Sequence, residues 1–187
     1  MEAIRLDEYT HRRFVFFSDP DGLPLERYEA QAHSNTLQKM RPFRWLTESV
    51  RSGTIASLVM MPLGFLFKLL DLRVGYYGPK LAAVLFGEPT RFVLFAQHLV
   101  LGWMSALPLL LILVYRSSAS APTAVGAVYG VGYYAVVNSL LLPLLFGDPT
   151  PWQLGLSFVY PSLLVHAVFG ASIGFTCRRF VAHARQP

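Results

Sequence analysis

Four long apolar runs fill most of the chain after its first fifty residues, and they predict four membrane-spanning helices. The runs cover about 54–70, 92–115, 123–146 and 154–177. A helix needs about 20 apolar residues to cross the hydrocarbon core of a bilayer. None of the runs alternates apolar and polar residues as a lipid-facing β-strand does, which favours helices over a barrel. The sequence therefore predicts an all-α integral membrane protein.

The first run is the least typical of the four. It is short, it contains Pro62, and Lys68 lies near its end. Residues 45–52 could extend it towards the N-terminus, and the long side chain of Lys68 can reach the lipid head groups. The sequence alone leaves open whether this run crosses the membrane fully.

Residues 1–50 form a polar segment that differs from the rest of the chain. Within it, residues 14–17 predict a short strand, residues 18–22 a turn, and residues 25–37 a polar helix. A segment with so few apolar positions does not build a sizeable core of its own. We expect it to lie on the cytoplasmic side of the membrane domain or to bind a partner.

Composition and charge agree with a membrane location. Hydrophobic residues make up 53% of the chain and charged residues 14%, whereas soluble domains carry about 25% charged residues. The basic residues flank the apolar runs, so membrane lipids are the expected partners and nucleic acid is not. The single cysteine, Cys177, excludes an internal disulfide and any cysteine-based metal site.

The distribution of basic residues predicts the orientation. The side that would carry both chain ends has eight Lys or Arg residues near the spans, and the other side has at most four. Basic residues accumulate on the cytoplasmic side of membrane proteins. We therefore predict a transmembrane domain over 51–180 in the inner (plasma) membrane, with both termini cytoplasmic and a cytoplasmic tail over 181–187.

An internal repeat organises the predicted spans. The hexapeptide Leu-Phe-Gly-Glu-Pro-Thr at 85–90 recurs as Leu-Phe-Gly-Asp-Pro-Thr at 145–150, and each copy is followed by a His-x-Val-x-Gly motif, at 98–102 and 166–170. Two helical hairpins with the same membrane orientation, a parallel repeat, would produce this pattern. The alternative is that Gly-acid-Pro-Thr is ordinary turn chemistry that recurs by chance.

Two acidic residues, Glu88 and Asp148, occupy equivalent places in the two hexapeptides. Glycine ends a helix readily, and an acidic residue before proline is held extended, so a structural role in a turn is expected. The alternative is a pair of outer-loop carboxylates that collect cations.

Small residues predict where helices pack closely. The pairs Gly126 and Gly130, and Gly170 and Gly174, are each spaced by four residues in the third and fourth runs. Such faces let helix backbones approach one another in lipid. They favour a contact between the two runs, and the same faces could instead join two copies of the chain. We expect either a homo-oligomer or an assembly with other membrane subunits.

Four polar side chains within the runs are the candidates for a site: Gln97, His98, Asn138 and His166. Polar groups inside a membrane are costly unless they are paired, so they should face the bundle interior. Three interpretations of the histidine pair are open. The histidines could be structural, they could line a proton or substrate path, or they could ligate haem b from two helices. A metal site is not expected, because no carboxylate lies within a run.

The sequence contains no recognisable catalytic motif, whether of a hydrolase, a P-loop, a zinc protease or a dinucleotide site. We therefore do not expect an enzyme. The favoured function is a structural or accessory subunit, or a small homo-oligomeric membrane protein. A small transporter or channel with a His and Asn path is the first alternative, and a haem b electron-transfer subunit is the second.

Residues of about 92–180 resemble the YagU-like group of small four-span inner-membrane proteins. The resemblance rests on His98, the glycine-rich 126–132, the turn at 147–150, the motif at 166–170, and the terminal Arg178 and Arg179. It implies a multispan membrane protein and no particular activity. The polar N-terminal segment departs from the group, whose members start close to their first span.

Overall fold

The structure is a computed structural model that describes residues 4–6, 8, 13–18, 20–28, 42–116 and 121–185. The chain divides into two compact units, Met1–Gln38 and Lys39–Gln186.

The N-terminal unit contains a three-stranded antiparallel sheet in the order β1-β2-β3. The strands are β1 (Arg5–Leu6), β2 (Arg13–Ser18) and β3 (Pro24–Tyr28). Two corrections follow. The all-α class is wrong for this unit, and the helix predicted over 25–37 is wrong at its start, because Leu25 pairs with Phe17 across the β2–β3 hairpin. Residues 29–37 lie outside the described residues.

The hairpin has a local cause that the sequence contains. The turn between β2 and β3 includes Pro20, Asp21 and Gly22, and Gly22 has a φ of +83°. Glycine takes this conformation without a steric penalty, so a tight turn forms there and aligns the apolar β2 with the residues that follow. Pairing between strands then overrides the weak helical pattern of residues 25–28.

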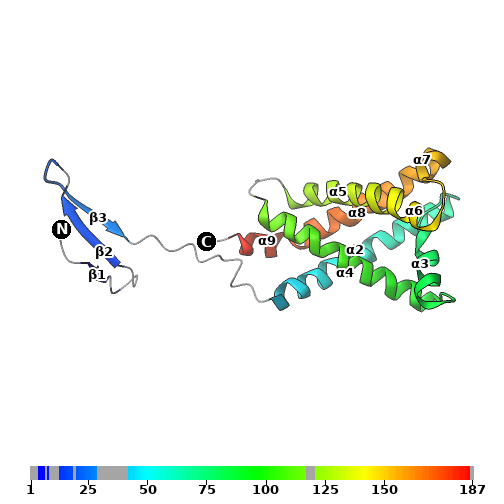
Figure 1. The fold of residues 1–187 in the computed structure, drawn as a ribbon, viewed down its shortest axis with the longest axis horizontal. Helices are drawn as coiled ribbons and strands as arrows, with labels where there is room; N and C mark the ends of the chain where they lie inside the picture. The colour runs from blue at the N-terminus through cyan, green and yellow to red at the C-terminus, as the bar shows by residue number, and fades with distance from the viewer. Residues whose placement is uncertain are drawn as a thin grey trace. The chain divides into compact units, whose positions relative to one another are not determined.

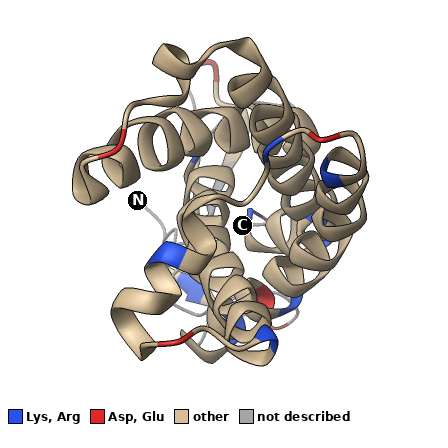
Figure 2. Ribbon diagram, turned by 90° about the vertical axis from the view of Figure 1, so that its right-hand side faces the viewer, with Lys and Arg blue, Asp and Glu red and all other residues tan. Residues whose placement is uncertain are grey.

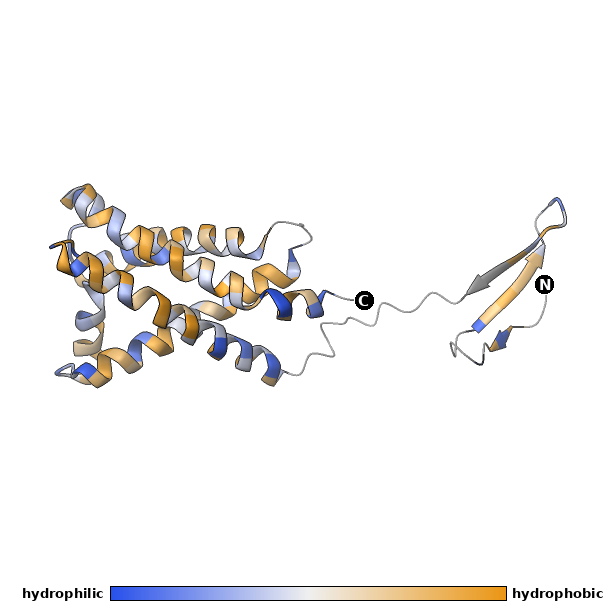
Figure 3. Cartoon of the chain, turned by 180° about the vertical axis from the view of Figure 1, so that it is seen from behind, coloured by the Kyte–Doolittle hydropathy of each residue, from blue (hydrophilic) through white to orange (hydrophobic). Residues whose placement is uncertain are grey.

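Four helices of the second unit are long and apolar enough to cross a membrane, which confirms the prediction of four spans. They are α2 (Pro42–Leu69), α4 (Arg91–Tyr115), the continuous helix α5 (Pro122–Tyr133), η1 (Tyr134–Leu141) and α6 (Leu142–Phe146), and α8 (Leu156–Thr176). Hydrophobic residues run along all four (Figure 3). The chain is a multi-pass membrane protein.

The first long helix differs from the predicted run. It begins at Pro42, well before residue 54, and its 28 residues make it about 42 Å long at 1.5 Å per residue. That exceeds the hydrocarbon thickness of about 30 Å, so α2 is long enough to span a bilayer even though Lys68 lies in its last turn.

Three short helices lie at the two ends of the bundle. Helices α3 (Tyr77–Phe86) and α7 (Pro151–Leu154) lie at one end, and α9 (Arg178–Ala184) lies at the other (Figure 1). We call these the α3 end and the α9 end. Neither α3 nor α9 was predicted, and α9 occupies part of the predicted tail over 181–187. Charged residues gather mostly near helix ends and loops (Figure 2).

The two hexapeptides play similar backbone roles. Gly87 ends α3 and Gly147 ends α6, with φ values of +80° and +65°. Thr90 and Thr150 then begin the next helices. The Thr90 hydroxyl accepts the amide of Val93, and the Thr150 amide donates to the Gln153 side chain. Each hexapeptide therefore stops one helix and starts another.

Backbones touch in two helix pairs. In the pair α5 and α8, a methyl group added to Gly126 would overlap the carbonyl of Gly170, and one added to Gly130 would overlap the carbonyl of His166. In the pair α2 and α4, a Cβ on Gly53 would lie 2.7 Å from the carbonyl oxygen of Gly102. The glycine faces of α5 and α8 thus meet within one chain.

The α9 end of the bundle is fastened by polar contacts between the pairs. Arg51 of α2 forms a 2.6 Å ion pair with Glu48 and donates a hydrogen bond of 2.9 Å to the carbonyl oxygen of Thr176, the last residue of α8. Arg185 donates to the carbonyl of Leu113 in α4. Cations that bind terminal carbonyls stabilise helix C-termini, and here they also tie the helices together.

Candidate functional site

A cavity of about 1010 Å³ lies among the long helices at the α3 end. Helices α2, α4, η1 and α8 contribute to its wall, together with the loop before α3 and the segment around α7. The residues that line it with groups able to form hydrogen bonds include His98, Ser105, Asn138, Asp148, Ser162 and His166. Three of the four predicted polar candidates therefore line one cavity.

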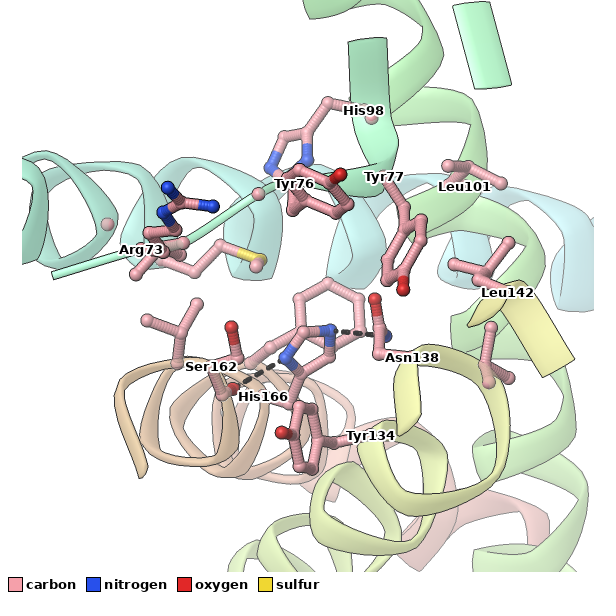
Figure 4. A pocket seen from close by; sticks show the side chains of 18 of the residues that line it. Arg73, Tyr76, Tyr77, His98, Leu101, Tyr134, Asn138, Leu142, Ser162 and His166 are labelled. Atoms are coloured by element: carbon pink, nitrogen blue, oxygen red, sulfur yellow. Dashed lines mark hydrogen bonds between the residues drawn. The ribbon is translucent and has the colours of Figure 1, made fainter. Parts of the chain in front are cut away.

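His166 is held at both ring nitrogens. Its Nδ1 lies 2.6 Å from the carbonyl oxygen of Ser162, one turn earlier, and must donate because a carbonyl only accepts. Its Nε2 lies 3.0 Å from the amide nitrogen of Asn138, which donates to it (Figure 4). These two bonds use the neutral imidazole with its proton on Nδ1.

Two tyrosines pack against the His166 ring. The ring of Tyr133 is stacked on it at a centroid distance of 5.9 Å, and the ring of Tyr134 is tilted at 5.6 Å. Tyr134 is only 1% exposed, and its hydroxyl has no hydrogen-bond partner among the described residues. Tyr134 lines the cavity, but its hydroxyl oxygen is itself buried.

Asn138 reaches His166 from a π-helical segment. Residues Tyr134–Leu141 form η1, and the Ser139 hydroxyl donates to the carbonyl of Tyr134 five residues earlier, at 3.2 Å. A π-helical turn widens the helix and rotates the residues that follow it, and such turns are frequent at functional sites. Neither η1 nor the two tyrosines could be predicted from the sequence, since an apolar run has the same pattern whether its helix is α or π.

His98 and its neighbour Gln97 have different surroundings. The Nε2 of His98 donates to the carbonyl oxygen of Ser57 in α2 over 3.3 Å, and the ring lines the cavity. Gln97 does not line it. Its side-chain amide donates to the carbonyl of Gly78 at 3.0 Å, so it fixes the beginning of α3. Gln97 is therefore a structural residue at the edge of the site.

Asp148 and Glu88 are not equivalent in the structure. Asp148 lines the cavity and forms a 2.5 Å ion pair with Lys80 of α3, and this hydrogen bond raises the pKa of Lys80 above its ordinary value. Glu88 is exposed and does not line the cavity. The structure does not bring the two predicted carboxylates together at the cavity.

Two basic residues that the sequence analysis did not select also line the cavity. They are Lys68, in the last turn of α2, and Arg73, in the loop that follows. The guanidinium of Arg73 lies over the ring of Phe158, 5.2 Å from its centroid. Within the described residues neither cation has a carboxylate within ion-pair distance. Their place at the end of an apolar run suggested membrane anchoring, and nothing in the pattern indicated a cavity beside them.

The donor set does not fit a haem. Ligation of one haem by both histidines needs a free ring nitrogen on each. Nε2 of His166 accepts from Asn138 and its Nδ1 carries the proton bonded to Ser162, so His166 offers none, and His98, whose Nε2 donates to Ser57, could offer only Nδ1. Among the described residues, no group of three His, Cys, Asp or Glu side chains could hold a metal ion.

Comparisons with known proteins define no family for this chain. No family model matches it, and no solved structure matches it. The chain is similar to the uncharacterized protein YaeR of Escherichia coli (strain K12), with 71% identity over 28 residues. That stretch covers 15% of this chain and only 22% of YaeR. The resemblance to the YagU-like group therefore remains a prediction. The fold therefore defines only the general class of the protein, which is a multi-pass membrane protein.

Proposed function

We propose that the protein is a small transporter of the inner (plasma) membrane and that the cavity is its substrate site. The observation that supports this most is that His98, Asn138 and His166 line one cavity. The cavity, at about 1010 Å³, has the volume of a small-molecule site. The structural or accessory role that the sequence favours gives no reason for such a space.

We infer that both termini are cytoplasmic. In this orientation the α3 end faces outward and the α9 end faces the cytoplasm. The cluster Arg178, Arg179 and Arg185 at the α9 end supports it, because basic residues accumulate on the cytoplasmic side.

The repeat predicted from the hexapeptides gives the transporter two moving halves. Gly102 of α4 and Gly170 of α8 end equivalent His-x-Val-x-Gly motifs, and each approaches a glycine backbone of its partner helix. This correspondence supports two helical hairpins of the same design, α2 with α4 and α5 with α8. Backbone contact leaves little room for motion within a pair, so each pair is expected to move as a unit.

The two ends of the cavity suggest an outward-open state. At the α9 end, Arg51 joins α2 of one pair to Thr176 of the other. At the α3 end the cavity lies between the pairs, and the ion pair of Lys80 with Asp148 is the contact beside it that joins α3 to the loop after α6. Rocking one hairpin against the other would break the Arg51 contact, open the α9 end and close the α3 end, which is alternating access.

Cysteine accessibility tests this proposal without knowledge of the substrate. Single cysteines are introduced into a Cys177→Ser background at Ser105 and Leu142, which line the cavity. A control cysteine replaces Leu140, which lies on the same helix as Leu142, is 49% exposed and does not line the cavity. A membrane-impermeant methanethiosulfonate reagent is applied to spheroplasts and to inverted vesicles.

A transporter should let the reagent reach both cavity cysteines from each side of the membrane, because each state opens one end. The control cysteine, facing lipid, should react from neither side. Reaction of the cavity cysteines from one side alone would describe a fixed bundle and would reject transport.

A further inference from the structure

The charge of the cavity wall is one-sided. Asp148 is neutralised by Lys80 at 2.5 Å, and the hydrogen bonds of His166 use its neutral ring. Lys68 and Arg73 remain, and within the described residues no carboxylate lies within ion-pair distance of either. A cavity with two such cations attracts an anion, and guanidinium and ammonium groups are the usual partners of phosphate and carboxylate.

The rest of the wall is apolar. Phe65 of α2, Leu101 of α4 and Phe169 of α8 line the cavity, and Phe65 is 63% exposed on a membrane-spanning helix. A fully hydrated inorganic anion would gain nothing from these side chains. A hydrocarbon chain would gain about 0.8 kcal/mol for each methylene group moved out of water.

We infer that the cavity binds an anionic amphiphile, a lipid whose phosphate or carboxylate head contacts Lys68 and Arg73 while its chain lies along Phe65, Leu101 and Phe169. The inference rests on the proposed function for the assumption that the cavity is a binding site, and it adds the chemical class of the substrate.

Native mass spectrometry of the full chain, released from a mild non-ionic detergent, tests the inference with three probes. Oleoyl lysophosphatidic acid carries both the anion and the chain. Oleoyl lysophosphatidylcholine has the same chain with a zwitterionic head, and inorganic phosphate has the anion alone. We expect one bound lysophosphatidic acid, at least tenfold weaker binding of lysophosphatidylcholine, and no bound phosphate.

Variants locate the binding. The double variant Lys68→Gln with Arg73→Gln should weaken lysophosphatidic acid binding at least tenfold, while Arg91→Gln, an exposed cation of α4 outside the cavity, should not.

Three results would overturn the inference. Equal binding of the two lysolipids would show that the anionic head group is not recognised. Binding of phosphate without either lysolipid would indicate that the ligand is a soluble anion. Undiminished binding by the double variant would show that the lipid binds away from Lys68 and Arg73. The lipid-binding test and the cysteine test can fail independently. Lipid binding without cysteine access from both sides would support the lipid ligand and reject the transporter function. Cysteine access from both sides without lipid binding would support the transporter function and reject the lipid ligand.

Discussion

The amide of Asn138 donates to Nε2 of His166 across 3.0 Å and joins the π-helical segment η1 to α8. The opposite ring nitrogen of His166 donates to Ser162 at 2.6 Å. The histidine is therefore fixed in one tautomer and one orientation by two neighbours from different helices. Since η1 sets the direction of Asn138, the hydrogen bond depends on the irregular helix.

Asn138→Leu should lower the free energy of unfolding by about 1–3 kcal/mol, because it leaves the His166 acceptor buried without a partner. Unfolding in mixed detergent and dodecyl sulfate micelles measures the change. Combining it with His166→Phe should cost less than the sum of the two single changes, since both ends of the bond are then absent. Additive losses would mean that the two side chains are not coupled.

Gly130→Ala should destabilise the bundle by about 1–3 kcal/mol, because the added methyl group would overlap the carbonyl of His166. The matched control is Gly132→Ala two residues later, where a Cβ meets no atom within 4 Å. That change should be neutral or slightly stabilising, since alanine favours helix more than glycine does. Thermal unfolding in detergent compares the two, and equal melting temperatures would contradict the close contact of α5 with α8.

The ion pair of Lys80 with Asp148 should make stability depend on pH in the alkaline range. The hydrogen bond to Asp148 raises the pKa of Lys80 in the folded state above its unfolded value. Its contribution is therefore complete below the unfolded pKa and is lost as pH rises through the raised folded pKa. Melting temperatures measured from pH 8 to pH 12 should show this loss in the native protein and less of it in Lys80→Met.

Asp148→Asn and Glu88→Gln form a matched pair for the same measurement. The first removes the partner of Lys80 and should reduce the alkaline dependence. The second changes the equivalent residue of the other hexapeptide, which is exposed, and should leave the pH profile unchanged. A similar shift in both variants would trace the effect to net charge and not to the ion pair.

Cys177 should not react with N-ethylmaleimide in the folded protein near pH 7. The side chain is completely buried, and burial raises the pKa of its thiol to about 12, whereas the thiolate is the reactive form. The mass added to the intact protein measures the reaction. Unfolding in dodecyl sulfate should allow full modification, and full modification without it would contradict the packing around the C-terminal end of α8.

The helices could be predicted from the sequence because lipid imposes a strong pattern. An apolar run such as 92–115 is stable in a bilayer only as a helix, and α4 covers Arg91–Tyr115. The beginning of α2 was harder, because Arg44, Glu48 and Arg51 interrupt the apolar pattern. The structure pairs Glu48 with Arg51, so these charges are accommodated within the helix.

The site could be predicted only in part. His98, Asn138 and His166 stood out because polar groups are rare within apolar runs. Lys68 and Arg73 did not, because terminal cations are ordinary near membrane interfaces, and Tyr134 did not, because a tyrosine does not interrupt an apolar run. Their significance comes from a cavity, and a cavity depends on how helices far apart in the sequence pack. Strand β3 was missed for a similar reason, since its pairing with β2 is not a local property.

The bond from Arg51 to Thr176 joins residues 125 positions apart. Synthesis begins at the N-terminus, so α2 enters the bilayer long before the carbonyl that its arginine needs has been made. Until the last span inserts, Arg51 has its partner Glu48 within α2 but lacks the carbonyl that connects it to the second hairpin. A chain truncated before α8 would keep the ion pair and lose this connection, so its first hairpin would have no such bond to a later span.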